Sequence, residues 1–396
     1  MRPAPKKSFL AVLALVVVST ALALSLAEAA VRLFKPQLTL SQAQSVSPRV
    51  FKKSQSLPST LLPNLDAEHQ ALTHEFTAHY TTNSLGYRGK EFAIDKPADT
   101  YRVLMLGDSV TFGWGVDDEQ TFSYILEEKL TQEAQGRNIE VINAGWHDGF
   151  APDSYYVYLN QEGLKLKPDL IILNLFPYND IADLREMVWV KTDDKGLPSA
   201  IESTDRAVRG GYHVERVSSN WKFRLPLLKN SHLAILAMTN LEQNSPATVT
   251  NIKKWLRLTE PQTIPAQEAE ACLYVLDCSR QMGELWDKLD QVLLGLNQLL
   301  VAENIPLLVN IIPAPSQTFP LGQAGELPQD LEPQQRFKDL FAVQSISFLD
   351  PLPLLVDQSY RSYFFPQDGH PAPAGHRKLA ETLFNHGTIR SWLNRL

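Results

Sequence analysis

The sequence predicts a three-layer α/β/α sandwich built on five parallel strands, and two observations support this. From Arg102 onward, short apolar runs alternate with segments of helical period, which is the sequence form of a parallel sheet with crossover helices. The chain has 396 residues, 44% hydrophobic and 20% charged, which is globular composition and enough length for a full domain with additions. A net charge of −7 without a basic stripe argues against a nucleic-acid partner.

Residues 1–35 are expected to hold a membrane anchor. An apolar run of 19 residues, from Phe9 to Ala27, follows three basic residues. About 20 apolar residues cross the bilayer core as a helix, and preceding basic residues favour a cytoplasmic N-terminus. We therefore expect a single-pass protein of the cell membrane, with the rest of the chain on the extracytoplasmic side. The alternative is a signal peptide cleaved at Ala27-Glu28-Ala29, which would leave a secreted or periplasmic protein.

Residues 36–98 are expected to form an irregular leader. Ser, Thr, Pro and Gln are scattered through this segment without sustained periodicity. Within it, residues 83–89 read Asn-Ser-Leu-Gly-Tyr-Arg-Gly, a turn-rich segment on the way into the domain. The α/β domain is then expected to occupy residues 99–396.

The elements of that domain follow from periodicity. Four-to-eight-residue apolar runs predict buried strands, and apolar residues at helical spacing predict the helices that cross between them. The predicted strands are 103–106, 139–142, 170–175, 305–312 and 346–349. The predicted helices are 121–134, 153–164, a strongly amphipathic one from Glu284, and 374–384.

Residues 185–283 interrupt the alternation and are expected to form an inserted subdomain or cap. The segment carries many polar and aromatic residues and several prolines, and it is too long for a loop. It contains the two cysteines of the chain, Cys272 and Cys278. Outside the cytoplasm they would be able to form a disulfide that closes a short loop, and two free buried thiols are the alternative.

Residues that are capable of catalysis follow the predicted strands. In an open parallel sheet, ligands bind beyond the carboxyl ends of the strands, so these residues are expected to meet at one edge. In chain order they are Gly107-Asp108-Ser109, Asn143-Ala144-Gly145 with Gly149, Asn179-Asp180, and Asp368-Gly369-His370.

This set fits the needs of acyl transfer. A serine hydroxyl is a poor nucleophile until a base removes its proton, so Ser109 is the expected nucleophile and His370 its base. Asp368 would fix the tautomer of the imidazole. The oxyanion of the tetrahedral intermediate needs fixed donors, and the candidates are the backbone N–H groups of Ser109 and Gly149 and the side-chain amide of Asn179.

The order of these residues resembles that of the SGNH hydrolases, the GDSL-type esterases. The resemblance rests on Gly107-Asp108-Ser109-Val110, the glycine after the second strand, Asn179-Asp180 and the late Asp368 and His370, and it covers roughly 101–184 and 284–396. It implies a flavodoxin-like sheet and neither a metal nor an organic cofactor. It implies the same roles for Ser109, Gly149, Asn179, His370 and Asp368.

Two departures from the family pattern leave alternatives open. Asp368-Gly369-His370 is one residue shorter than the usual Asp-x-x-His, a spacing similar to that of a membrane-associated branch that includes polysaccharide O-acetyltransferases. The role of Asp368 therefore stays open. Three residues separate Gly145 from Gly149, so Gly145 is an alternative oxyanion donor.

Other readings of single residues also stay open. His376 is the competing candidate for the base, and a turn-capping side chain is the alternative role for Asn179. Trp146 and Tyr155, Tyr156 and Tyr158 would suit either a sugar-stacking wall or ordinary packing of a helix face, and packing is favoured.

Three functions are compatible with these residues. The first is serine-dependent hydrolysis of an ester, such as an O-acyl group on an envelope glycan or lipid, through an acyl-enzyme. The second is O-acyl transfer to a glycan hydroxyl, and the third is a non-catalytic envelope-binding protein. The expected partners are an ester substrate and, through the N-terminal helix, the membrane.

Overall fold

The computed structural model describes residues 6–40, 42, 50–71, 75–146, 150–203, 221–226, 228–256, 279–318, 332–356, 359–366 and 368–396. The chain divides into two compact units. One consists of Met1–Ser47 and Val214–Gln262, and the other of Pro48–His213 and Thr263–Leu396. The segment 185–283, expected to be one insertion, is thus shared between both units.

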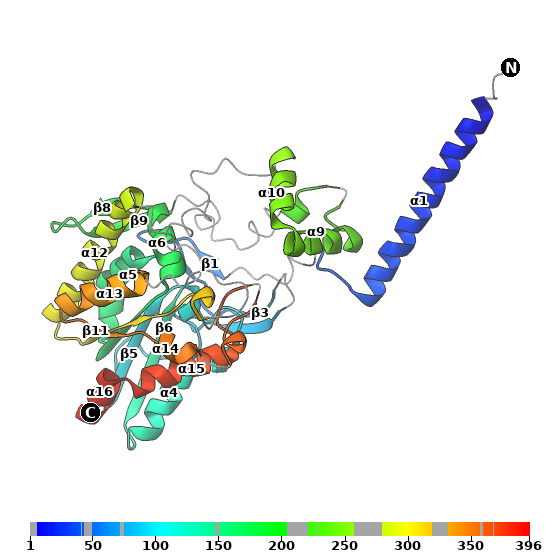
Figure 1. Ribbon diagram of the computed structural model, residues 1–396. Helices are drawn as coiled ribbons and strands as arrows, with labels where there is room; N and C mark the ends of the chain where they lie inside the picture. Colours follow the sequence, from blue (N-terminus) through cyan, green and yellow to red (C-terminus); the bar gives the residue numbers. More distant parts are fainter. Residues whose placement is uncertain are drawn as a thin grey trace. The chain divides into compact units, whose positions relative to one another are not determined.

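The larger unit is built on a five-stranded parallel sheet, which confirms the predicted fold class (Figure 1). The strands are β5 (Thr100–Gly107), β6 (Asn138–Gly145), β7 (Leu170–Leu175), β10 (Leu307–Ile311) and β11 (Ser347–Leu349). Their spatial order is β11-β10-β7-β5-β6. Numbered along the chain this is 2-1-3-4-5, the flavodoxin-like order.

Helices cover both faces of the sheet, because alternate residues of each buried strand point to opposite sides. On β5, Leu104 and Leu106 belong to one apolar cluster, while Val103 and Met105 belong to the other. The first cluster includes residues of α5 (Pro152–Gln161), α6 (Pro177–Glu186), α12 (Ser279–Ala302) and α13 (Glu332–Val343). The second includes residues of α4 (Phe122–Glu133), α15 (Pro373–Asn385) and α16 (Gly387–Arg395).

The carboxyl ends of β5 and β6 are level, because Gly107 pairs with Gly145 in their register. The segments that follow these two strands therefore start side by side. Shorter helices complete the unit: α3 (Ser109–Phe112), α14 (Leu352–Leu355) and the 3₁₀ turns Asp118–Gln120, Gly163–Leu166, Pro315–Thr318 and Tyr360–Ser362. A hairpin of β8 (Met187–Thr192) and β9 (Pro198–Ser203) packs on α5.

Part of the segment expected to be an irregular leader forms regular structure. β1 (Phe51–Lys52) pairs with β2 (Thr60–Leu61), and β3 (Asp66–Gln70) pairs with β4 (Thr77–Thr81), both antiparallel. The β3–β4 hairpin contributes the buried Ala78 and Tyr80 to the first apolar cluster. The period-2 signal of these short strands is too brief to be recognised in sequence.

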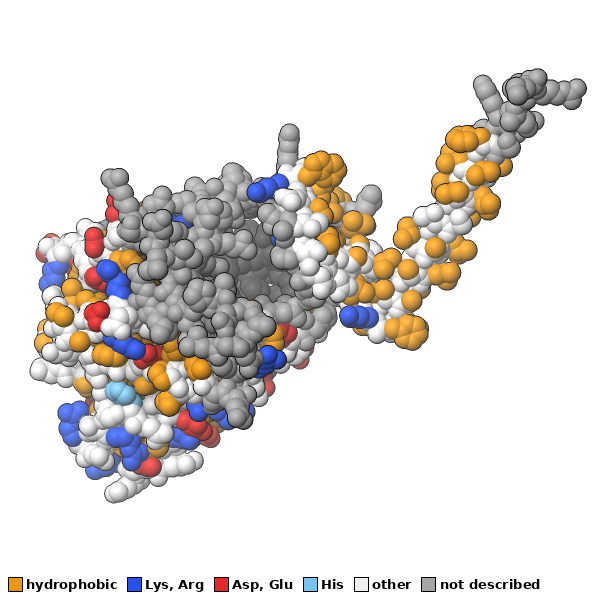
Figure 2. All heavy atoms as spheres, in the orientation of Figure 1, with side chains coloured by type: hydrophobic (Ala, Val, Ile, Leu, Met, Phe, Trp, Pro, Cys, Tyr) orange, Lys and Arg blue, Asp and Glu red, His pale blue; other side chains and the backbone are white. Residues whose placement is uncertain are grey.

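The smaller unit contains α1 (Lys6–Phe34), α9 (His232–Asn244), α10 (Pro246–Trp255) and a 3₁₀ turn at Trp221–Phe223. Among the described residues, Ala11–Phe34 is the one helix long and apolar enough to cross a membrane. Its side chains are largely exposed and hydrophobic, as the orange surface of this helix shows (Figure 2). Trp221, Met238 and Val249 form a small core between the turn and the other two helices.

Candidate active site

Ser109 lies at the turn from β5 into α3. Asp108 caps this short helix, because its carboxylate accepts a hydrogen bond from the N–H of Val110 at 3.0 Å. Gly107 is required for room: a Cβ there would lie 2.1 Å from Oγ1 of Thr111. The sharp turn therefore presents Ser109 at the carboxyl edge of the sheet, where it is only 2% exposed.

His370 and Asp368 lie in a tight loop just before α15. The N–H of Phe365 donates to the carbonyl oxygen of His370, and the N–H of Gly369 donates to that of Phe365, both at 2.9 Å. Gly369 has a φ of +86°, which glycine adopts without strain. The loop is closed by a bridge between Phe364 and Pro371.

The structure brings these three predicted residues together. Nε2 of His370 lies 2.7 Å from Oγ of Ser109, although 261 positions separate the two residues. Nδ1 of His370 lies 2.6 Å from Oδ1 of Asp368. The side chains of His370 and Asp368 are 21% and 19% exposed, so the group borders on solvent while Ser109 is enclosed.

The structure describes only some of the expected oxyanion donors. Ser109 is the first residue of α3, where helical N–H groups have no intrahelical acceptor. Asn179 lies in the first turn of α6. Gly149 lies outside the described residues. The alternative donor, Gly145, is engaged, because its N–H donates to Oδ1 of Asn143 at 2.9 Å.

Sequence reasoning missed the role of the Asn143 side chain. Its amide donates to the carbonyl oxygen of Thr111 at 2.8 Å and to Oγ of Ser123 at 2.9 Å. Asn143 thus joins the end of β6 to α3 and α4. Asparagine at the end of an apolar strand was the available signal.

A buried carboxyl group, Asp180, lies near the serine turn. It accepts hydrogen bonds from the hydroxyl of Tyr155 at 2.9 Å and from the N–H of Phe176 at 2.7 Å. Burial, together with the negative charge of Asp108, raises the pKa of Asp180 well above its ordinary value. Its hydrogen bond with Tyr155 ties α6 to α5.

Arg88 supports the segment that follows Ser109. Its side chain is 1% exposed and pairs with Asp118 at 2.8 Å. It also donates to carbonyl oxygens of Phe112, Gly113 and Val116, at 2.8, 2.7 and 2.6 Å. In sequence, this residue was only one member of a turn-rich segment.

His376 is not placed to act on Ser109. It is fully buried, its ring stacks on Phe122, and its Nδ1 accepts the N–H of Phe122 at 3.2 Å. Burial, with smaller contributions from the charges of Arg88 and His370, lowers the pKa of His376 to about 3. The imidazole next to the serine is that of His370.

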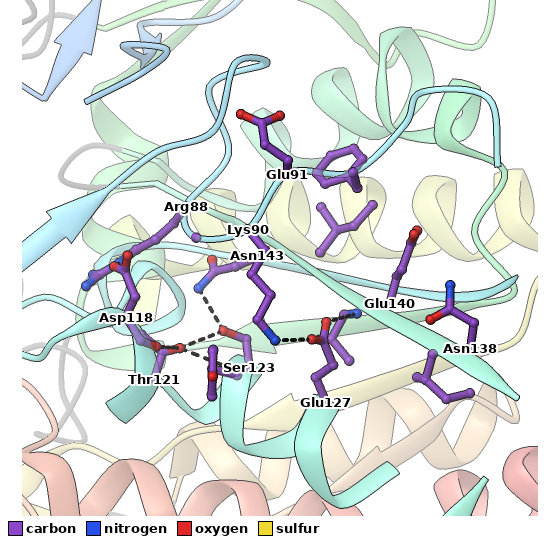
Figure 3. A pocket seen from close by; sticks show the side chains of 16 residues that line it. Arg88, Lys90, Glu91, Asp118, Thr121, Ser123, Glu127, Asn138, Glu140 and Asn143 are labelled. Atoms are coloured by element: carbon purple, nitrogen blue, oxygen red, sulfur yellow. Dashed lines mark hydrogen bonds and ion pairs between the residues drawn. The ribbon is translucent and has the colours of Figure 1, made fainter. Parts of the chain in front are cut away.

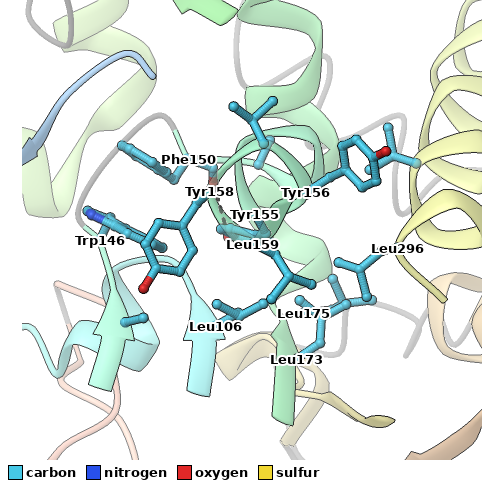
Figure 4. Packing of buried hydrophobic residues seen from close by; sticks show 14 of the residues in the cluster. Leu106, Trp146, Phe150, Tyr155, Tyr156, Tyr158, Leu159, Leu173, Leu175 and Leu296 are labelled. Carbon is cyan, nitrogen blue, oxygen red and sulfur yellow. Dashed lines mark hydrogen bonds between the residues drawn. The ribbon is translucent and has the colours of Figure 1, made fainter. Parts of the chain in front are cut away.

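The aromatic residues after β6 pack in the core. Trp146 stacks on Phe150, and Tyr155, Tyr156 and Tyr158 are each less than a tenth exposed (Figure 4). The preferred interpretation as helix packing is confirmed, and the sugar-stacking wall is not supported.

A polar pocket of about 250 Å³ lies along the outer edge of β6 (Figure 3). It is lined by 88–92, by residues of α4 and by β6 itself, and Lys90 pairs with Glu127 there at 2.7 Å. Neither Ser109 nor His370 is among the lining residues.

Within the described part of the chain, no three His, Cys, Asp or Glu side chains are grouped to hold a metal ion. Cys272 and Cys278 lie outside the described residues.

Comparison with known proteins gives similar folds without a family match. No protein-family model matches the chain, and a search of curated proteins found no match. Among solved structures, it is similar to a catalytic mutant of the acetylxylan esterase Axe2 from Geobacillus stearothermophilus, at 12% identity and a TM-score of 0.37, covering 72% of this chain and 92% of that one. It is also similar to a member of the lipolytic G-D-S-L family from Veillonella parvula DSM 2008, at 13% identity and a TM-score of 0.36. That match covers 73% of this chain and 98% of the other.

A third similar structure is the lipase/acylhydrolase from Enterococcus faecalis, at 14% identity and a TM-score of 0.34, covering 75% of this chain and 97% of that one. Likeness at these identities and scores carries no argument about activity.

Proposed function

We propose that this protein is a serine-dependent ester hydrolase of the SGNH type that removes an O-acyl group from an envelope glycan or lipid through an acyl-enzyme. The observation that carries the proposal is the hydrogen-bonded chain from Ser109 through His370 to Asp368, with distances of 2.7 and 2.6 Å. An imidazole held between a hydroxyl and a carboxylate is the arrangement that activates a serine nucleophile.

The first step follows from the tautomer of His370. The carboxylate of Asp368 accepts a hydrogen bond from Nδ1–H, so the lone pair of Nε2 faces Oγ of Ser109. As Oγ attacks the ester carbonyl carbon, Nε2 takes its proton, and Asp368 stabilises the imidazolium. The proton then passes to the leaving alkoxide, which departs as an alcohol and leaves acyl-Ser109.

The second step is hydrolysis of that intermediate. Water attacks the acyl carbon, Nε2 again takes the proton, and the carboxylic acid leaves as Ser109 regains its hydrogen. In both steps the tetrahedral oxygen carries negative charge. We propose that the backbone N–H of Ser109, at the start of α3, donates to this oxygen together with Gly149 and Asn179.

Labelling with a fluorophosphonate tests the nucleophile. We expect wild-type protein to be labelled and Ser109→Ala to lose the label. The matched control is Ser391→Ala, because Ser391 is an exposed serine on α16. Persistent labelling of Ser109→Ala would remove Ser109 from the mechanism.

Turnover of p-nitrophenyl acetate with and without an added glycan tests the acceptor. A hydrolase releases p-nitrophenol without the glycan, because water accepts the acyl group. An O-acyltransferase would depend on the glycan and would yield an acylated product. A non-catalytic binding protein would show no turnover that depends on Ser109.

We also propose that α1 anchors the protein, with the catalytic unit outside the cytoplasm. The support is a helix of 24 apolar-rich residues, Ala11–Phe34, whose side chains are exposed. We expect the mature protein to resist a carbonate wash and to keep its N-terminal residues. A soluble form that begins near Ala30 would show cleavage instead.

A further inference from the structure

The β3–β4 hairpin contacts the loop that carries Asp368 and His370. The N–H of Asp368 donates to Oε2 of Glu75 at 2.9 Å, across 293 positions of sequence. Glu75 therefore fixes the backbone of the residue whose carboxylate orients the imidazole. The carboxylate of Asp368 in turn accepts from the backbone N–H of His370 at 3.3 Å and from its ring.

Apolar packing supports the same contact. Phe76, next to Glu75, packs on Phe365 of the loop with ring centroids 4.9 Å apart. His69 of the hairpin packs on Trp114 at 4.3 Å, and Trp114 lies 6.2 Å from the ring of His370. Phe76 and Trp114 are less than a tenth exposed, so the apolar contacts between hairpin and loop are buried.

The hairpin also grips the segment that follows Ser109. The N–H of Gly115 donates to the hydroxyl of Tyr80 at 2.9 Å. The N–H of His79 donates to Asp117 at 2.7 Å. The β3–β4 hairpin thus contacts both the loop that carries His370 and the segment that follows Ser109.

We propose that Glu75 is a positioning residue, through which the β3–β4 hairpin holds Asp368 and His370 at hydrogen-bonding distance from Ser109. This inference rests on the proposed serine mechanism. Glu75 acts through the hydrogen bond that it accepts from the backbone of Asp368 and takes no part in proton transfer. Its effect on rate is large because small displacements of catalytic groups are costly, about 10²-fold for about 1 Å.

The test compares three substitutions at Glu75 in the full-length protein, with p-nitrophenyl acetate as substrate. Glu75→Ala removes the acceptor, and we expect kcat to fall about tenfold or more with KM changed less than about twofold. Glu75→Gln keeps an acceptor oxygen at the same reach, and we expect kcat within about threefold of wild type. Glu75→Asp keeps the charge on a shorter side chain, and we expect a loss close to that of Glu75→Ala.

Glu68→Ala is the matched control, because Glu68 is an exposed glutamate on the same hairpin. We expect this variant to keep the wild-type kcat. Thermal unfolding of each variant separates loss of fold from loss of position, and Glu75→Asp supplies the comparison if Glu75→Ala does not fold. Rescue by Gln but not by Asp is the signature of an acceptor that must reach the Asp368 N–H.

The outcomes separate this inference from the proposed function. A folded Glu75→Ala with wild-type kcat overturns the positioning role, and so does a Glu75→Gln as slow as Glu75→Ala. Ser109→Ala is measured beside them. If Ser109→Ala keeps its turnover, the serine mechanism itself is wrong. If Ser109→Ala loses its turnover while Glu75→Ala keeps the wild-type kcat, only the role of Glu75 is refuted.

Discussion

Asp368 contacts Nδ1 of His370, while Nε2 of the same ring faces Ser109. Its carboxylate can only accept, so the Nδ1–H tautomer is the one it stabilises at 2.6 Å. An asparagine at this position would be able to donate its amide hydrogen to Nδ1, which places the proton on Nε2 and removes the base. The geometry thus supports the orienting role that the short Asp-Gly-His spacing left open.

We expect Asp368→Asn to lower kcat for p-nitrophenyl acetate by about 10² to 10⁴-fold with a small change in KM. Asp339→Asn is the control, because Asp339 is exposed on α13. Steady-state kinetics on both variants measure the effect. A loss below about threefold in Asp368→Asn would show that the carboxylate does not set the tautomer.

His376 makes stability depend on pH. Burial lowers its pKa to about 3 from the ordinary 6.5 of an exposed imidazole. Between these values the unfolded chain binds a proton that the folded chain does not. The contribution of His376 is therefore complete above about pH 6.5 and is lost progressively as the pH falls towards 3.

We expect His376→Gln to flatten the fall of unfolding free energy between pH 6.5 and 3, a fall worth several kcal/mol for this group at about 1.4 kcal/mol per unit. Denaturant unfolding at a series of pH values measures it. His79→Gln is the control, since His79 is exposed and pairing with Asp66 raises its pKa, which gives the opposite sign. An unchanged acid slope in His376→Gln would contradict the assignment.

At the scale of elements, three segments meet at Gly115. A Cβ there would lie 2.7 Å from Phe365 of the histidine loop and 3.1 Å from Phe76 of the hairpin. Its φ of +86° also lies in the left-handed region that glycine adopts without strain. Gly115 is thus the point at which the serine segment, the hairpin and the histidine loop pack together.

We expect Gly115→Ala to destabilise the fold by about 1–3 kcal/mol and to lower kcat, because Phe365 must shift and carries its loop with it. Gly136→Ala is the matched control, since Gly136 has a φ of +90° but nothing within 4 Å of its added Cβ. That variant bears backbone strain alone and should keep its kcat. Equal kinetics for the two variants would show that the packing at Gly115 does not reach the site.

Elements with long periodic signals were predictable, and those with brief ones were not. The five strands of the sheet are buried apolar runs, and β7 has the predicted bounds, Leu170–Leu175. The hairpins of residues 50–81 are two to five residues a strand, and their side chains gain meaning only against the rest of the fold. The roles of Arg88 and Glu75 were not predictable for the same reason. Each is a single charged residue whose hydrogen-bond partners lie far away in the sequence.

For the molecule as a whole, the division into two units depends on contacts that no local pattern reveals. Glu28 of α1 accepts hydrogen bonds from the N–H groups of His232 and Leu233 at 3.0 and 2.8 Å. It also accepts from the hydroxyl of Ser231 at 2.8 Å. In the sequence, Glu28 fits the cleavage site of a signal peptide, whereas in the structure it caps a helix more than 200 positions away.

Glu28 and Ser231 together accept hydrogen bonds from the first backbone N–H groups of α9. Ser231 accepts from the N–H of Ala234 at 3.1 Å, so three of the first N–H groups of this helix have side-chain acceptors. Loss of such a cap costs about 1 kcal/mol, or about fivefold in local opening. We therefore expect Glu28→Ala, in detergent-solubilised full-length protein, to raise amide hydrogen exchange in the first turn of α9 by about that factor.

The catalytic unit should not sense this change, because the described partners of Glu28 all belong to its own unit. Fluorophosphonate labelling of Ser109 and exchange in α4 should stay at wild-type values. Glu133→Ala, on the exposed side of α4, should leave exchange in α9 unchanged. Unaltered exchange in α9 of Glu28→Ala would refute the cap, and a parallel loss of labelling would show that the anchor-side unit supports the active site after all.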